Sequence, residues 1–202
     1  MKDVTYAYAH TYALHQPGPI MWPFRRNGSD APLTLEKGLS TFFDRKDEWL
    51  KSTCRDQLIG LLEQHKPTGG WLITKAVVVG VGRLLGPEIR GRERSLLQLI
   101  AFLEVVNHLQ AEGSPKIELY SQELKHTEVE VEMLDFLGIQ SIMDDKAQQM
   151  SMPGVFIFAQ ACPAEVEMVA QCEHRQPSLF VGISTANMVD RERDLWLPNA
   201  RE

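Results

Sequence analysis

The chain has 202 residues, of which 44% are hydrophobic and 24% charged, and its formal net charge at pH 7 is -6. This length suits one well-filled α/β core, and because no apolar run approaches the roughly 20 residues that span a bilayer, no membrane association is expected. The acidic balance argues against a general nucleic-acid coat, although it leaves room for a local basic patch.

The sequence contains little that indicates a metal site or a particular cellular compartment. The N-terminus lacks the basic region and the continuous apolar run of a signal peptide, so a cytoplasmic location is expected. Cys54, Cys162 and Cys172 show no metal-ligand spacing, and the six histidines form no HxxxH or CxxH pair. We therefore expect neither a metal nor another cofactor.

Residues 1–33 are rich in proline and small polar residues, which predicts an irregular arm. The arm also carries more aromatic residues than a purely solvated tail would need, so we expect part of it to pack on the domain or to act as a lid. These aromatic residues are Tyr6, Tyr8, Tyr12, Trp22 and Phe24.

Two helices are predicted from Thr34 onward. Leu35, Leu39, Phe42 and Phe43 lie on one helical face, and a second amphipathic stretch runs from Trp49 to Leu62. Thr34 resembles half of a capping box, and Ser52 or Thr53 is a candidate cap for the second helix.

Strands and helices alternate beyond this point. The β-branched run Trp71–Val79 predicts a strand buried on both faces of a parallel sheet. The remaining pattern predicts helices at 91–113, 126–138 and 163–173, and strands at 116–120, 139–144, 154–161 and 177–184. This order predicts an α/β fold, a Rossmann-like three-layer sandwich with a mostly parallel central sheet and N-terminal helices, in one domain over 34–190 with a tail at 191–202.

The strand ends supply the candidate ligand site, because ligands of such sheets bind at the carboxyl ends of the strands near the point where strand order reverses. The residues expected there are Gly80 to Arg83, Tyr120 to Glu123, Asp144 and Asp145, Gln160 to Cys162, and Gly182 to Thr185.

Gly80-Val81-Gly82 resembles the first half of a dinucleotide fingerprint, but Leu85 stands where the third glycine belongs. No acid directly ends the predicted second strand, where Tyr120 stands, and Glu123 is late even for a methyltransferase. A nicotinamide cofactor is therefore not favoured. The alternative is that these glycines only let the strand turn into a loop.

The start of the 91–113 helix is basic. Arg90, Arg92 and Arg94 beside Ser95 would add bidentate contacts to the anion-binding end of that helix, although a solvated charged loop is an equal alternative.

The acids and nucleophiles at the other strand ends are ambiguous. Asp144 and Asp145 could hold a cation, act as a base or only cap a turn. Cys162 and Ser184 are nucleophile-capable, but neither has a histidine nearby in sequence.

The motif order resembles the sensitivity-to-red-light-reduced-like domain family in its fungal form over about residues 47–185. The resemblance is carried by Gly80 to Arg83 after a strand, Arg94-Ser95 with Gln98 at a helix start, Glu130 to Gly138, and Asp144-Asp145. Within this family the chain is similar to the arginine-containing cyclodipeptide synthases, which take amino acids from charged tRNAs and close a diketopiperazine.

The resemblance implies a role for each candidate. It implies arginyl-tRNA and a second aminoacyl-tRNA as partners, with Asp144 or Asp145 holding the substrate guanidinium or acting as base, and arginines meeting tRNA phosphate. The implied catalytic residues are Asp144, Asp145 and Ser95; the implied substrate-binding residues are Gly80, Gly82, Arg83, Tyr120, Glu123, Gln160, Cys162 and Ser184; the implied tRNA-binding residues are Arg90, Arg92 and Arg94.

Two departures from the family pattern stand out. Arg83 occupies the place of a small residue or serine, which removes an acyl acceptor, and Gln148 replaces the last carboxylate of the D-D-x-x-E pattern. Two other functions remain open: a non-catalytic regulatory protein, which in a haem-linked version would use His126 or Cys162 as ligand, and a methyltransferase.

Overall fold

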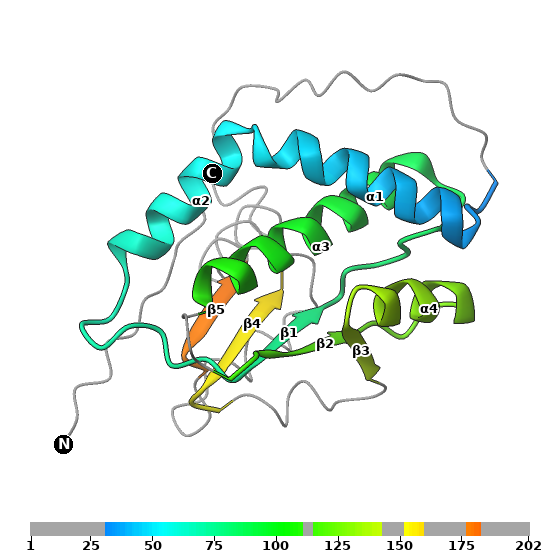
Figure 1. Cartoon of the computed structure of the whole chain (residues 1–202). Coiled ribbons are helices and arrows are strands. Elements are labelled where there is room, and N and C mark those ends of the chain that lie inside the picture. Colours follow the sequence, from blue (N-terminus) through cyan, green and yellow to red (C-terminus); the bar gives the residue numbers. More distant parts are fainter. Residues whose placement is uncertain (1–30, 111–114, 143–151, 160–176, 183–202) are drawn as a thin grey trace, which may run out of the picture.

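The structure is a computed structural model that describes residues 31–110, 115–142, 152–159 and 177–182. Its centre is a five-stranded sheet in which every neighbouring pair is parallel. The strands are β1 (Lys75–Val79), β2 (Glu118–Gln122), β3 (Ile139–Ile142), β4 (Val155–Ala159) and β5 (Leu179–Gly182), in the spatial order β3-β2-β1-β4-β5. Helices flank this sheet (Figure 1), so the α/β fold predicted from the sequence is confirmed.

Four helices are described: α1 (Leu35–Leu50), α2 (Thr53–Gln64), α3 (Ile89–Leu109) and α4 (Glu128–Phe136). The Thr34 side chain caps α1 by accepting a hydrogen bond from the Lys37 N–H, and Ser52 caps α2 by accepting from the Arg55 N–H. The two helices expected before the first strand are confirmed, except that Trp49 lies at the end of α1 and not in the second helix. No helix in the described ranges is both long and apolar enough to cross a membrane.

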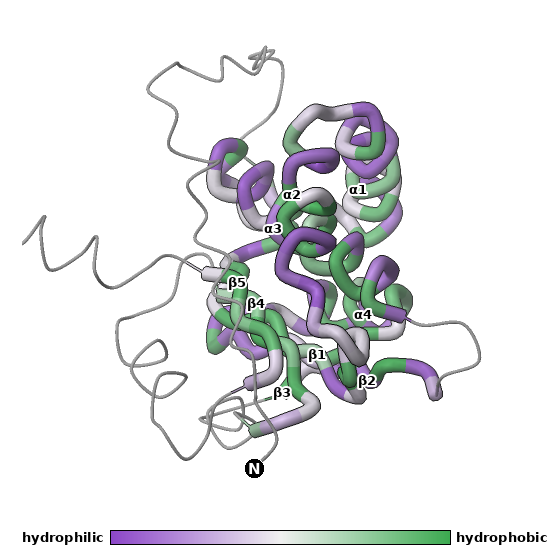
Figure 2. The backbone as a smooth tube through the Cα atoms, turned by 90° about the vertical axis from the view of Figure 1, so that its left-hand side faces the viewer, coloured by the Kyte–Doolittle hydropathy of each residue, from purple (hydrophilic) through white to green (hydrophobic). Residues whose placement is uncertain are grey.

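Both faces of the central strand β1 are buried. Ala76 and Val78 pack with the helices in the larger core, whereas Val77 and Val79 belong to a second cluster made of strand residues on the opposite face. In the larger core, Phe102 of α3 stacks on Phe156 of β4 with ring centroids 5.7 Å apart. Figure 2 shows the strands as a mostly hydrophobic band, whereas α1 and α2 mix both kinds of residue. The predicted burial on both faces is therefore confirmed, although the strand begins at Lys75 and not at Trp71.

The two N-terminal helices are fastened to α3 by ion pairs. Arg45 of α1 contacts the Glu93 carboxylate through Nε at 2.7 Å and Nη2 at 3.2 Å. Arg55 of α2 contacts Glu104 through Nε at 2.8 Å. The backbone N–H of Leu33, just before α1, also donates to the Leu85 carbonyl at 3.0 Å. These contacts join α1 to the loop that follows β1.

That loop begins at the point where strand order reverses. From β1 the chain proceeds to β2 and β3 on one side, whereas β4 and β5 lie on the other side. The carboxyl end of β1 is therefore the place where parallel sheets of this type bind ligands.

Candidate functional site

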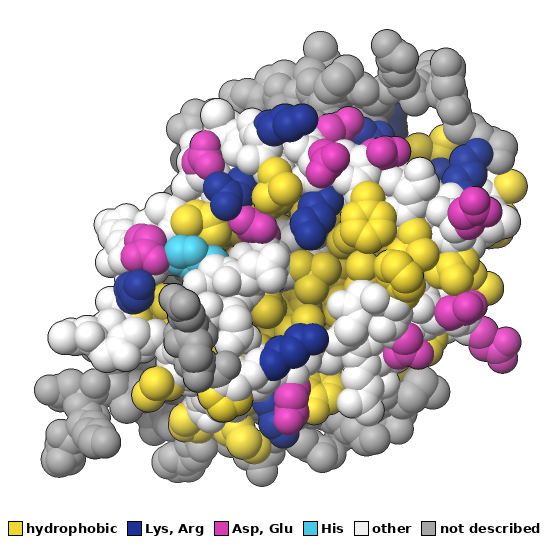
Figure 3. All heavy atoms as spheres, in the orientation of Figure 1, with side chains coloured by type: hydrophobic (Ala, Val, Ile, Leu, Met, Phe, Trp, Pro, Cys, Tyr) yellow, Lys and Arg dark blue, Asp and Glu magenta, His cyan; other side chains and the backbone are white. Residues whose placement is uncertain are grey.

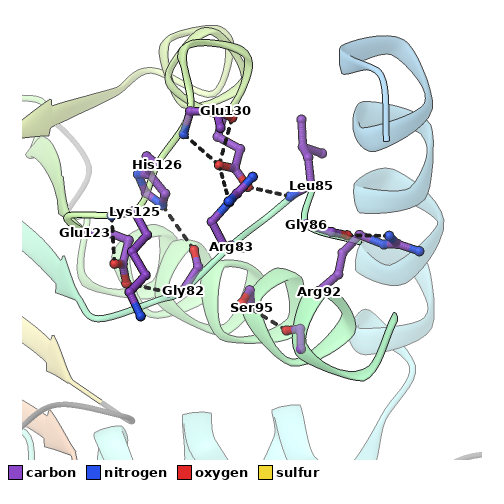
Figure 4. Close-up of polar contacts among 12 residues, drawn as sticks. Gly82, Arg83, Leu85, Gly86, Arg92, Ser95, Glu123, Lys125, His126 and Glu130 are labelled. Carbon is purple, nitrogen blue, oxygen red and sulfur yellow. Dashed lines mark hydrogen bonds and ion pairs between the residues drawn. The ribbon is translucent and has the colours of Figure 1, made fainter. Parts of the chain in front are cut away.

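The turn after β1 is held through the backbone of one glycine. Gly80 and Gly82 adopt φ values of 68° and 79°, in the left-handed region that favours glycine. The Gly82 N–H donates to Glu123 Oε2 at 2.9 Å, and the Gly82 carbonyl lies 3.2 Å from His126 Nε2. Both backbone groups of Gly82 are thus bound by residues that follow β2, as Figure 4 shows.

Ser95 lies directly against this turn. A Cβ at Gly82 would lie 3.0 Å from the Ser95 hydroxyl oxygen, so only glycine fits without displacing the serine. Ser95 is 4% exposed, and its hydroxyl donates to the Gly91 carbonyl at 3.0 Å. The structure therefore brings Ser95 and Gly82 together.

Arg83 binds a buried carboxylate at the start of α4. Its Nε lies 2.9 Å and 3.1 Å from the two oxygens of Glu130, which is 0% exposed. Glu130 also accepts from the N–H of Leu85 and from both the N–H and the hydroxyl of Thr127. Arg83 thus grips a carboxylate, but the carboxylate belongs to this chain.

These contacts change the acidity of Glu130. Burial alone would raise the pKa of this carboxyl, but the hydrogen bonds from Leu85, Thr127 and Arg83 outweigh it and hold the pKa below the ordinary value. The ionised form is therefore the form that fits the site.

Glu123 directly follows β2, because β2 continues to Gln122. The expectation that this acid comes late was wrong, since the strand extends two residues beyond the predicted end at Tyr120. Both Glu123 oxygens are used, one by the Gly82 N–H and the other by the Lys125 N–H at 3.1 Å.

Tyr120 does not join the turn. It lies in the middle of β2 with the cluster on the opposite face of the sheet, and its hydroxyl donates to Glu118, the first residue of that strand, at 2.7 Å. Its predicted place at a strand end was wrong, again because β2 extends beyond it.

The three arginines at the start of α3 differ. Arg90 and Arg94 are exposed, as a contact to tRNA phosphate would require. Arg92 is 6% exposed, and its Nη1 donates to the Gly86 carbonyl at 2.6 Å. Arg92 is therefore no surface cation, which the spacing of the three residues could not reveal.

His126 is a site residue that the sequence reasoning considered only as a haem ligand. Since a carbonyl can only accept, Nε2 carries the proton that reaches Gly82, and Nδ1 is left as an acceptor. Nδ1 is buried and has no hydrogen-bond partner among the residues that the structure describes. Burial lowers the pKa of His126, and the charges of Glu130 and Glu123 and the bond to Gly82 only partly oppose this.

The sequence does contain a pattern that indicates where this region lies. Thr127-x-x-Glu130 forms a capping box at the start of α4, a pattern that marks a helix start. It places His126 directly before that helix, at the same sheet edge as the glycine turn.

Several predicted site residues cannot be placed against this geometry. Asp144, Asp145, Gln160, Cys162 and Ser184 lie outside the described residues. Within the described ranges there is no group of three or more His, Cys, Asp or Glu side chains that could hold a metal ion.

Comparison with known proteins gives one match. A family model described as SRR1 domain matches residues 55–200, well over half of the chain. Neither the curated proteins nor the solved structures contain a match. The matched range begins inside α2, so α1 lies before it.

Proposed function

Since the chain belongs to the SRR1 domain family, we propose that it is a cytoplasmic cyclodipeptide synthase that joins arginine, delivered by arginyl-tRNA, to a second aminoacyl group. The observation that carries the proposal is His126, which lies beside the glycine turn at the switch point with a buried Nδ1 that has no partner in the described part of the chain. A base at this position is what the reaction requires.

The chemistry asks little more of the protein. The α-amine of one aminoacyl group attacks the ester carbonyl of the other, so a C–N bond forms and the C–O bond to tRNA breaks. The amine passes its proton to a base, and the departing ribose oxygen gains one. Because the ester is already activated, positioning and a neutral imidazole supply the main needs of each of the two amide bonds.

His126 suits the role of base through its charge state. Its lowered pKa keeps the imidazole neutral near physiological pH, and no described residue donates a hydrogen bond to its Nδ1. In this proposal Arg90 and Arg94 meet tRNA phosphate, and Asp144 or Asp145 holds the arginyl guanidinium.

Product analysis tests the proposal. The purified chain is incubated with arginyl-tRNA and mixed aminoacyl-tRNAs, and cyclic dipeptides are sought by mass spectrometry. His126→Gln should lower the yield at least about a hundredfold, at the small end of general-base effects, whereas His65→Gln, at the C-cap of α2, should leave it unchanged. Asp144→Ala and Asp145→Ala should abolish product with the fold intact. Absence of product while the tRNAs stay charged would overturn the proposal.

A second candidate is a non-catalytic regulatory protein of the same family, and the Arg83–Glu130 ion pair favours it. The position of the small residue or serine is filled by a guanidinium bound to a buried carboxylate, so it offers no acyl acceptor. A haem-linked version would show a Soret shift on titration with haem, but His126 Nε2 is already bound to Gly82. Calorimetry with S-adenosylmethionine tests the methyltransferase alternative.

A further inference from the structure

Arg92 carries a buried positive charge that the described residues do not neutralise. Its side chain is 6% exposed, yet it takes part in no ion pair within the described ranges. Its one hydrogen bond there runs from Nη1 to the Gly86 carbonyl, and its Nε is buried without a partner. A guanidinium has five N–H donors, so most of its capacity is unused.

The acid next to it in the sequence is committed to another arginine. Glu93, the next residue in α3, is held by Arg45. Glu88, one turn earlier, lies with its carboxylate beside Gly91 and forms no ion pair with Arg92 in the described structure.

The distribution of ion pairs among the arginines is the reverse of what the cost of desolvation predicts, because a buried charge needs a partner more than an exposed charge does. Arg45, Arg55 and Arg83 are all more exposed than Arg92, and each of them has a carboxylate partner. Burial of a charge without a partner is unfavourable, so buried charges in proteins are normally paired. An anion from outside the described residues would supply the partner that Arg92 lacks.

The surroundings suit such an anion. Arg92 lies in the first turns of α3, where the N-cap residue Glu88 makes no side-chain capping bond. Unpaired N–H groups and the helix dipole favour negative charge at this end. Figure 4 shows the Arg92 side chain reaching past Gly86 toward α1, away from His126 and Glu123. The position is therefore separate from the proposed base.

We propose that Arg92 anchors an oxyanion site at the start of α3 that binds one phosphate group. The planar guanidinium can hold two phosphate oxygens, and helix N–H groups supply further donors. The proposal does not rest on the proposed function, because it requires no aminoacyl transfer. The phosphate can belong to a small molecule or to the backbone of an RNA.

Thermal unfolding in phosphate tests the site directly. The melting temperature of the full chain is followed as inorganic phosphate replaces chloride at constant ionic strength. Binding to the folded state alone makes the melting temperature rise with the logarithm of phosphate concentration. Arg92→Met should weaken phosphate binding at least about tenfold. Lys116→Met, which changes an exposed cation just before β2, should keep most of the response.

Arg92→Met should fold, because it replaces an unpaired buried charge by an apolar side chain of similar length. A second readout needs no variant: the Nε–H resonance of Arg92 in the wild-type protein should shift on phosphate titration. Equal melting temperatures in phosphate and chloride with an unchanged Nε–H resonance would overturn the proposal, as would a full phosphate response in Arg92→Met.

Two further binding measurements distinguish between the two possible sources of the phosphate. Weaker binding of uncharged tRNA to Arg92→Met than to wild type, with Lys116→Met as comparison, identifies RNA as the source. Unchanged tRNA binding together with lost pyrophosphate binding identifies a small phosphorylated ligand. If Arg92→Met binds both tRNA and pyrophosphate as well as wild type does, the proposed site is contradicted. Product formation is not measured in any arm, so failure here is distinct from failure of the synthase.

Discussion

The Nε atom of Arg83 lies 2.9 Å from one Glu130 oxygen and 3.1 Å from the other, although the two residues are 47 positions apart in the chain. The pair joins the loop after β1 to the start of α4. Since the Leu85 N–H donates to the same carboxylate, Glu130 holds the loop at two points.

Glu130→Gln should destabilise the fold by about 3 kcal/mol, because it removes one partner of a buried ion pair and misaligns the backbone donors around it. Urea denaturation measures the loss. Glu132→Gln, which changes an exposed acid two residues further along α4, is the matched control and should stay within about 0.5 kcal/mol of wild type. Equal stability of the two variants would show that the ion pair contributes nothing.

The free energy of unfolding should decrease in two stages as the pH is lowered. The pKa of His126 is below 6.5, so under pH 6.5 the unfolded chain binds more protons than the folded chain, and the free energy of unfolding decreases as pH falls. The pKa of Glu130 is below 4.5, so its contribution is complete above that pH and is lost as pH falls through the folded-state pKa.

The two stages can be assigned with variants. His126→Gln should flatten the first stage and leave the second, whereas His65→Gln should leave both. Urea unfolding at a series of pH values supplies the slopes. A wild-type slope that persists in His126→Gln would mean that another group causes it.

Alanine substitutions at two glycines should have opposite effects. Gly82 has φ 79°, and a Cβ there would meet Ser95, so Gly82→Ala should cost more than about 1 kcal/mol. Gly60 lies inside α2 with nothing near its Cβ position, so Gly60→Ala should stabilise by about 0.5–1 kcal/mol. Ser95→Gly combined with Gly82→Ala should recover part of the loss, and no recovery would indicate that backbone strain alone accounts for it.

Removal of α1 should loosen the loop after β1, although α1 lies before the range matched by the family. A chain that starts at Lys51 loses the Leu33–Leu85 hydrogen bond, the Arg45–Glu93 contact and the side chain of Phe42, which is 1% exposed. Its stability should fall by more than about 3 kcal/mol. A chain that starts at Ala31 keeps all three contacts and is the control.

A single substitution tests the same contact more gently. A Cβ at Gly38 would collide with the Leu85 side chain, so Gly38→Ala should push α1 away from the loop. Limited proteolysis between Val81 and Glu88 should become faster than in wild type. An unchanged cleavage rate would show that the loop does not depend on α1.

The sequence predicted the fold well where residue type and periodicity agreed. The β-branched run before Gly80 gave β1, and the apolar spacing from Leu96 onward gave α3. It failed at the end of β2, where Ser121 and Gln122 are polar and read as loop. In the structure Ser121 is fully buried, because hydrogen bonds to β1 on one side and β3 on the other continue the strand whatever its side chains.

The residues of the site were harder to predict from the sequence than the fold was, for a related reason. Glu128, Glu130 and Glu132 all lie on α4, and composition gives each of them the appearance of a solvated acid. Only the rotation of α4 against the loop after β1 decides that Glu130 is the buried one. That rotation depends on contacts with residues more than 40 positions away, and no local pattern records them.

The position of β1 at the centre of the sheet sets an order of assembly. Residues 31–142 contain α1 to α4 and three adjacent strands, so this half can form while the ribosome is still adding the rest of the chain. The partner of Lys75 on the other side is Val155, so one edge of β1 stays unpaired in the nascent chain until β4 emerges. An unpaired central strand is a template for association with another chain. We therefore expect the risk of misassociation to be greatest before the synthesis of the chain is complete.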